Sequence, residues 1–246
     1  MKEIRHRIDP SGQRMIDFIN RIYEEVGPRL AGSEEEMKAG NIIHDELTGF
    51  CDEVNQEEFS CRPGGFLGFI WITALFYIAG VLAYFIIHPL ISSFFILIAL
   101  LVYFVQLNLL YEVIDPLFPE KTEFHVIGKI KPQRKPQKLI LLSGHHDSAF
   151  EFPLLSKLAS KSYILIMIAV VSAILSIFLG LLRTIFQIFF NHSRSWIDPF
   201  AFIPTTQNLT LVNAIDIIQM IIFPVGTILM IVLALFLRSN KVVFGA

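Results

Sequence analysis

The sequence predicts an α/β domain that is interrupted by two transmembrane helical hairpins, and so four membrane-spanning helices in all. Of the 246 residues, 54% are hydrophobic and only 17% are charged, whereas about a quarter of a soluble chain is charged. The apolar residues are concentrated in four long runs, and the polar segments between them carry helix and strand patterns. A net charge of −2 gives no positive field for a polyanion, so nucleic acid is excluded as a partner.

Four apolar runs predict the membrane-spanning helices. A helix rises about 1.5 Å per residue, so about 20 residues cross the roughly 30 Å hydrocarbon core. Only His88 and Pro89 separate the first two runs, which therefore form a tight antiparallel hairpin. Arg183 interrupts the end of the third run, where we expect it to snorkel to the interface, followed by an interfacial segment. The runs cover residues 66–87, 90–110, 162–182 and 217–237.

These runs divide the chain into five segments. Residues 66–110 and 162–237 form the two hairpins, and residues 1–65, 111–161 and 238–246 form the pieces of one α/β domain. Each hairpin returns the chain to the side it left, so all three polar pieces lie on one side of the bilayer. Only Arg194 is basic at the hairpin tips, which predicts cytoplasmic bases and a cytoplasmic catalytic side. The basic residues at the bases are Arg62, Lys121, Lys157, Lys161, Arg238 and Lys241.

The polar segments contain two helix signals and three strand signals. Apolar residues at helical spacing predict a helix over 10–26, and a capping box of Ser33 and Glu36 begins a second helix. Strands are predicted over 53–59, 124–130 and 138–142. Cys51 and Cys61 bracket an extended stretch of roughly 33 Å, too long for a disulfide, and are predicted to be free thiols.

Chemistry is expected where the strand over 138–142 ends. In open α/β sheets ligands bind at the carboxyl ends of strands, and this strand is followed by Gly144, His145, His146, Asp147 and Ser148. A histidine nitrogen can hold zinc while a nearby carboxylate accepts the other ring N–H. The alternative is a polar loop in which Asp147 and Ser148 cap the next helix. One histidine cannot hold a catalytic metal alone.

Taken together, three elements resemble the N-terminal half of the co-catalytic zinc aminopeptidases of metallopeptidase family twenty-eight. They are the GPRLAGSE element at 27–34 with its helix, the strand over 53–59, and the GHHDS strand end at 144–148. The resemblance implies a zinc-exopeptidase-like α/β domain that hydrolyses peptide substrates with two zinc ions. It implies that His145 is a zinc ligand and that Asp147 is the catalytic-site residue orienting it. His146 falls at the variable position and receives no role.

The resemblance stops where the next family motif would open, at Phe244, Gly245 and Ala246. The bridging aspartate, the Glu-Glu pair and the other ligands have no counterpart in this chain. We therefore expect an N-terminal, membrane-inserted portion of the enzyme that is inactive as it stands, with the remaining ligands and the general base beyond Ala246.

Two other functions stay open. One is a metal-free, receptor-like or binding relative of the same fold. The other is a small four-helix transport component, for which the only ionisable residues in or beside the spans are Arg183 and Asp216, both near helix ends. The bilayer is an expected partner under every alternative, whereas substrate preference and oligomeric state are not determined.

Overall fold

The computed structural model describes residues 10–189, 211–237 and 241–243. The chain divides into two compact units. One consists of residues 64–118 and 152–238, and the other of residues 1–63, 119–151 and 239–246. Arg194, Arg238 and the ending at Phe244–Ala246 lie outside the described residues.

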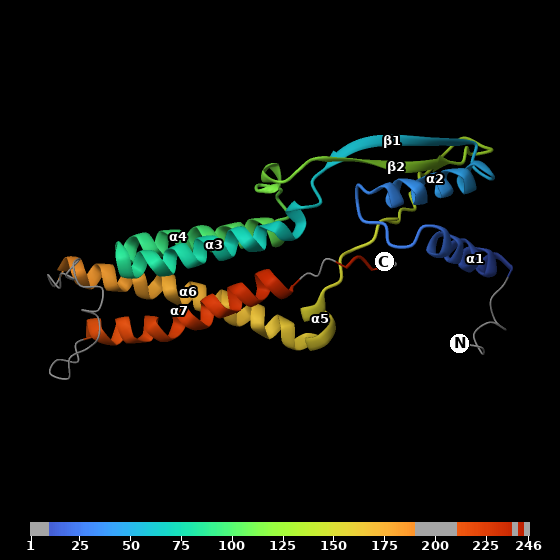
Figure 1. The fold of residues 1–246 in the computed structure, drawn as a ribbon. Helices are drawn as coiled ribbons and strands as arrows, with labels where there is room; N and C mark the ends of the chain where they lie inside the picture. Colours follow the sequence, from blue (N-terminus) through green and yellow to red (C-terminus); the bar gives the residue numbers. More distant parts are fainter. Residues whose placement is uncertain (1–9, 190–210, 238–240, 244–246) are drawn as a thin grey trace. The chain divides into compact units, whose positions relative to one another are not determined.

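The first unit is a bundle of four helices, each long and apolar enough to cross a membrane (Figure 1). Their number and lengths agree with the four predicted membrane spans. Between the first two, His88 caps the following helix by accepting the Leu90 N–H at Nδ1, 3.1 Å away. The helices are α3 (Gly65–Ile86), α4 (Pro89–Leu107), α6 (Ser160–Phe189) and α7 (Leu211–Phe236), with a short 3-10 helix η2 (Asp115–Leu117) and α5 (Pro153–Leu158) beside them.

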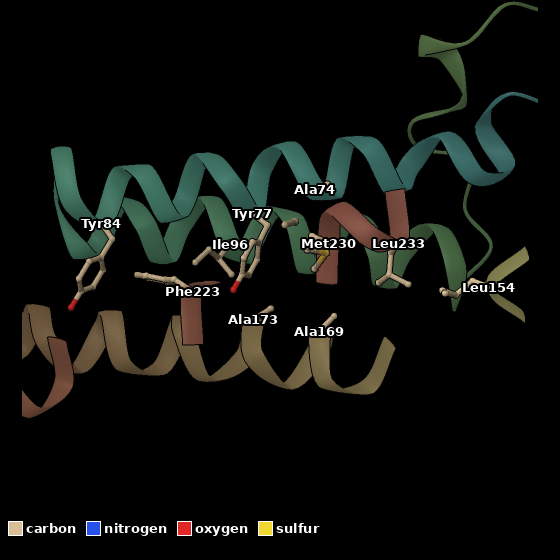
Figure 2. Packing of buried hydrophobic residues seen from close by; sticks show 11 residues of the cluster. Ala74, Tyr77, Tyr84, Ile96, Leu154, Ala169, Ala173, Phe223, Met230 and Leu233 are labelled. Carbon is tan, nitrogen blue, oxygen red and sulfur yellow. The ribbon is translucent and has the colours of Figure 1, made fainter. Parts of the chain in front are cut away.

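Small residues and aromatic rings share the interior of the bundle. Tyr77 and Tyr84 extend from α3 into the interior, where Tyr84 meets Phe223 of α7 with ring centroids 5.1 Å apart (Figure 2). A Cβ on Gly180 of α6 would lie 3.1 Å from the Pro89 carbonyl oxygen of α4 and closer still to the Ser93 hydroxyl. Glycine therefore permits the close approach of α4 and α6, as is usual between helices in lipid.

Arg183 does not snorkel, and that prediction is wrong. Its side chain is buried inside the bundle with only 4% of the residue exposed, and its Nε lies 3.3 Å and 3.4 Å from the two carboxylate oxygens of Asp216. Tyr84 donates its hydroxyl hydrogen to the same carboxylate. The segment after Arg183, which the sequence predicts to be interfacial, continues α6 as a helix to Phe189. The Arg183 charge is thus balanced by Asp216 on a neighbouring helix, whereas snorkelling would have placed it in water at the interface.

The second unit packs two helices with a two-stranded sheet. The helices are α1 (Pro10–Glu25) and α2 (Glu34–Thr48), close to the predicted bounds. Strands β1 (Glu53–Cys61) and β2 (Lys121–Lys129) pair antiparallel, with Glu53 opposite Lys129 and Cys61 opposite Lys121. Ile22 of α1 and Ala39 and Ile42 of α2 form its small apolar cluster.

The third predicted strand is absent, and that prediction is wrong. Residues 138–142 pair with no other strand among the described residues, and Leu139 and Leu142 are 93% and 91% exposed. Strand preference reflects the fit of side chains to a pleated surface with neighbours on it. Here β1 and β2 pair only with each other, so the apolar run has no strand beside it. The sheet thus has two strands, whereas the sequence predicts three for the α/β domain.

Candidate functional site

The segment that carries the two histidines is held by the loop between α1 and α2. The Ser148 N–H donates to the Arg29 carbonyl at 2.7 Å, and the Arg29 N–H donates to the Ser148 hydroxyl at 3.3 Å. Leu30 and Ser148 form a parallel bridge, and the Arg29 guanidinium donates through Nε to the His146 carbonyl at 2.5 Å. The GPRLAGSE element and the GHHDS element are therefore in direct contact, although the strand expected before the second is not formed.

Side chains alternate along this segment, as in any extended backbone. His145 and Asp147 are the more exposed pair, with 68% and 37% of their side chains accessible. His146 is 20% exposed and Ser148 is buried at 1%. One pair thus faces outward and the other inward, which places the two predicted site residues on the same side.

The outward pair forms the interaction that the spacing predicts. Nδ1 of His145 lies 2.9 Å from Oδ1 of Asp147, within hydrogen-bonding distance. A carboxylate in this position holds the proton on Nδ1 and leaves Nε2 as the basic nitrogen. Among the residues that the structure describes, Nε2 of His145 has no hydrogen-bond partner.

The inward pair shows a residue that sequence reasoning missed. Nε2 of His146 lies 2.5 Å from Oε1 of Glu36, which is only 3% exposed, although the angle is not that of a hydrogen bond. Phe124 of β2 lies against the same imidazole, with ring centroids 6.1 Å apart. Burial raises the pKa of the Glu36 carboxyl above its ordinary value, and the neighbouring His146 opposes this shift.

Glu36 was predicted to complete a capping box with Ser33. The Ser33 hydroxyl does accept the Glu36 N–H at 3.2 Å and caps α2, so the predicted helix start is confirmed. The Glu36 carboxylate contacts His146 instead of reaching back to its own helix end. The capping pattern explains why a glutamate stands at position 36 without a contact to a distant residue. Nothing in the local sequence therefore indicates the contact with His146.

The capping alternative for Asp147 and Ser148 is wrong. The next helix, α5, begins at Pro153 with Phe152 at its N-cap, and no side chain caps it. Ser148 is bonded to Arg29, and Asp147 lies beside His145. Both polar side chains are thus used to hold the segment and its exposed imidazole.

The fit of zinc to these residues is incomplete. Zinc takes three or four protein ligands, and the described residues contain no group of three or more His, Cys, Asp or Glu side chains arranged to hold a metal ion. His145 and Asp147 supply one imidazole and its carboxylate partner. The described residues alone therefore do not form a zinc site.

Cys61, at the end of β1, lies near this region and is chemically protected. Cys51 and Cys61 are both free thiols, as predicted. Cys61 Sγ donates to Oε1 of Glu123 at 2.8 Å, and burial together with that carboxylate raises the pKa of the Cys61 thiol to about 12. At pH 8 only about one molecule in ten thousand then carries the reactive thiolate.

Iodoacetamide is accordingly expected to alkylate Cys61 at pH 8 far more slowly than a free thiol, whose pKa is about 8.5. Glu123→Gln should accelerate the reaction, because it removes the carboxylate that disfavours the thiolate. Peptide mass spectrometry of timed aliquots measures both rates. Alkylation of Cys61 in the unchanged protein as fast as that of free cysteine would contradict this description.

No protein-family model, curated protein or solved structure matches the chain.

Proposed function

We propose that this chain supplies the membrane anchor and the first zinc ligand of a zinc-dependent exopeptidase of the aminopeptidase type, built on a zinc-exopeptidase-like α/β domain. The observation that carries the proposal is the contact between His145 Nδ1 and Asp147 Oδ1 at 2.9 Å, with the imidazole largely exposed. A histidine whose one ring nitrogen is held by a carboxylate can offer the other nitrogen to a metal ion. Here the second nitrogen is left available to a ligand.

The surrounding contacts support the same function. Arg29 and Ser148 hold the extended segment at two backbone positions, and the His146–Glu36 contact fixes its inward face. These contacts hold the backbone around His145, and Asp147 Oδ1 lies beside its Nδ1; a metal ligand requires such support. Zinc, when bound, would supply Lewis acidity toward a peptide carbonyl and lower the pKa of a bound water. The other ligands and the general base would come from outside the described residues.

The proposal is tested on the protein purified from membranes. Zinc content by atomic emission should reach two ions per chain, and hydrolysis of aminoacyl substrates should be lost with a chelator and recovered with zinc. A product with no zinc above background and no hydrolysis of any aminoacyl substrate would overturn the proposal. It would favour the metal-free, receptor-like relative.

The proposal includes a cytoplasmic catalytic side, which rests on the basic residues at the hairpin bases. A reporter fused after Glu120 or after Lys161 is expected to behave as cytoplasmic, and one fused near Arg194 as external. A paired reporter assay, with alkaline phosphatase active outside and green fluorescent protein fluorescent inside, measures this. The reverse pattern at all three positions would place the site on the other side of the membrane.

A second candidate is the four-helix transport component, favoured by one observation. Nη1 of Arg183 and Oε1 of Gln219 are buried in the bundle without a hydrogen-bond partner among the described residues, and such groups often mark a translocation path. Replacing Arg183 and Asp216 together by Met and Leu separates the two functions. Loss of a solute-uptake phenotype with hydrolysis unchanged would support transport.

A further inference from the structure

The transmembrane bundle contains an apolar cavity of about 290 Å³ that no part of the proposed function uses. It is nearly twice the size of the roughly 150 Å³ apolar cavity that takes up benzene in another protein. Helices α3, α4, α6 and α7 all contribute to its wall. None of its lining residues carries a charge, and Thr73, Tyr103 and Tyr163 are the only lining residues with a polar side-chain atom.

The cavity follows the bundle over the depth of one bilayer leaflet. Along α6 it is lined from Tyr163 to Ala173, a separation of ten residues and about 15 Å at the helical rise. Half of a hydrocarbon core of about 30 Å is the same length. Tyr103 and Tyr163 lie towards the ends of α4 and α6 that are away from the α3–α4 turn. Tyrosine is enriched at the membrane interface, so these two residues suit that end of the cavity.

Small residues mark the other end of the cavity, in the middle of the bundle. Ala99 and Ala173 are each only 1% exposed, and Ala173 faces the bundle interior beside Tyr77 (Figure 2). The Thr73 hydroxyl in the same wall has no hydrogen-bond partner among the described residues. Apolar walls of this kind do not hold water, and a ligand with a charge at this depth would have nothing to neutralise it.

We propose that the cavity binds one acyl chain of a bilayer phospholipid, with the headgroup at the level of Tyr103 and Tyr163. The occupant is a lipid rather than a peptide because the lining offers only three hydroxyl groups, too few for the amide groups of a peptide, which must be satisfied inside a membrane. It is a single chain because the cavity spans about one leaflet in depth and holds only about 290 Å³. The lipid would be retained by the bundle instead of exchanging with the surrounding bilayer.

The test uses the whole chain reconstituted in phosphatidylcholine vesicles that contain a phosphatidylcholine with a photoactivatable diazirine at the end of one acyl chain. After illumination, crosslinked residues are mapped by mass spectrometry. Labelling of Ala173 and Met230, which are 1% and 7% exposed, is expected, as is labelling of the lipid-facing Ile174 and Leu175. Labelling confined to Ile174 and Leu175 would overturn the proposal.

Ala173→Phe fills the cavity and is expected to reduce the crosslink at Met230 at least tenfold, with Ile174 still labelled. Leu175→Phe is the matched control, since it adds an aromatic ring to the exposed face of the same helix and should leave Met230 labelled. If Ala173→Phe does not yield folded protein, the smaller change Ala99→Leu on α4 provides the same comparison. Unchanged labelling of Met230 in the folded cavity variant would reject the site.

A last arm identifies the source of the chain. Diazirine-labelled palmitic acid replaces the labelled phospholipid at the same molar fraction. Labelling of Met230 by the phospholipid, with or without labelling by the fatty acid, supports a lipid-chain site of the bilayer. Labelling by the fatty acid alone would overturn the phospholipid assignment.

Discussion

Under the proposed function, His145→Ala is expected to abolish zinc-dependent hydrolysis. The substitution removes the one imidazole that the described site presents to a ligand, so zinc loses a first-sphere donor and added zinc should not restore full activity. Zinc content and hydrolysis of an aminoacyl substrate are measured on the same preparation. Circular dichroism should be unchanged, because the His145 side chain is largely exposed.

Two neighbouring variants separate this role from a general disturbance of the segment. Asp147→Asn keeps the size of the side chain but weakens the acceptor beside His145 Nδ1, and loss of such a partner typically costs about 10- to 100-fold in metal affinity or activity. His146→Ala should cost far less activity than His145→Ala. Its main effect should be on stability, because it removes the side chain that contacts the buried Glu36 carboxyl.

The order of these effects decides the register of the motif. If His146→Ala abolished zinc binding and His145→Ala retained it, the outward and inward faces of the segment would be exchanged. The alignment of residues 144–148 with the zinc aminopeptidase pattern would then be wrong by one residue.

Arg183→Met is expected to destabilise the transmembrane bundle by about 3–5 kcal/mol, the usual result of removing one partner of a buried ion pair. Asp216 would be left as an unpaired carboxylate at 4% exposure, and among the described residues the Tyr84 hydroxyl would remain as its hydrogen-bond partner. Unfolding by a denaturing detergent, followed by circular dichroism in bicelles, measures the change.

Arg183→Met combined with Asp216→Leu should recover most of that stability, since replacing both members of a buried pair with apolar residues is often neutral. Gln187→Met is the control on α6, one turn away. Its Oε1 has no hydrogen-bond partner among the described residues, so its loss should cost little. A double variant as unstable as Arg183→Met would show that Arg183 stabilises the bundle through contacts other than Asp216.

The membrane helices could be predicted because their signal is local. Twenty apolar residues in sequence specify a span regardless of what they contact, and the described bounds of α3 and α4 agree closely with the runs. The partner of Arg183 could not be predicted in this way. Asp216 lies 33 residues further along the chain, and only the packing of α6 against α7 brings the two charges together.

The candidate site was predictable in part for the same reason. The contact between His145 and Asp147 follows from alternation in an extended backbone, which needs no knowledge of the fold. The contact between Glu36 and His146 joins a helix start to a distant loop, and Glu36 already had a local explanation as a capping residue. The strand over 138–142 failed because apolar β-branched and leucine residues favour a strand only where a neighbouring strand exists.

The uncovered run at residues 138–142 also has a practical consequence. Leu139, Ile140, Leu141 and Leu142 are all more than four-fifths exposed, and their backbone can pair with the same run in a second molecule, as unprotected strands do. Pairing between molecules depends on protein concentration. Two samples with the same thermal midpoint but different concentrations would then aggregate to different extents. Precipitation threshold, rather than melting temperature, is the property to follow when choosing buffers and storage conditions for this chain.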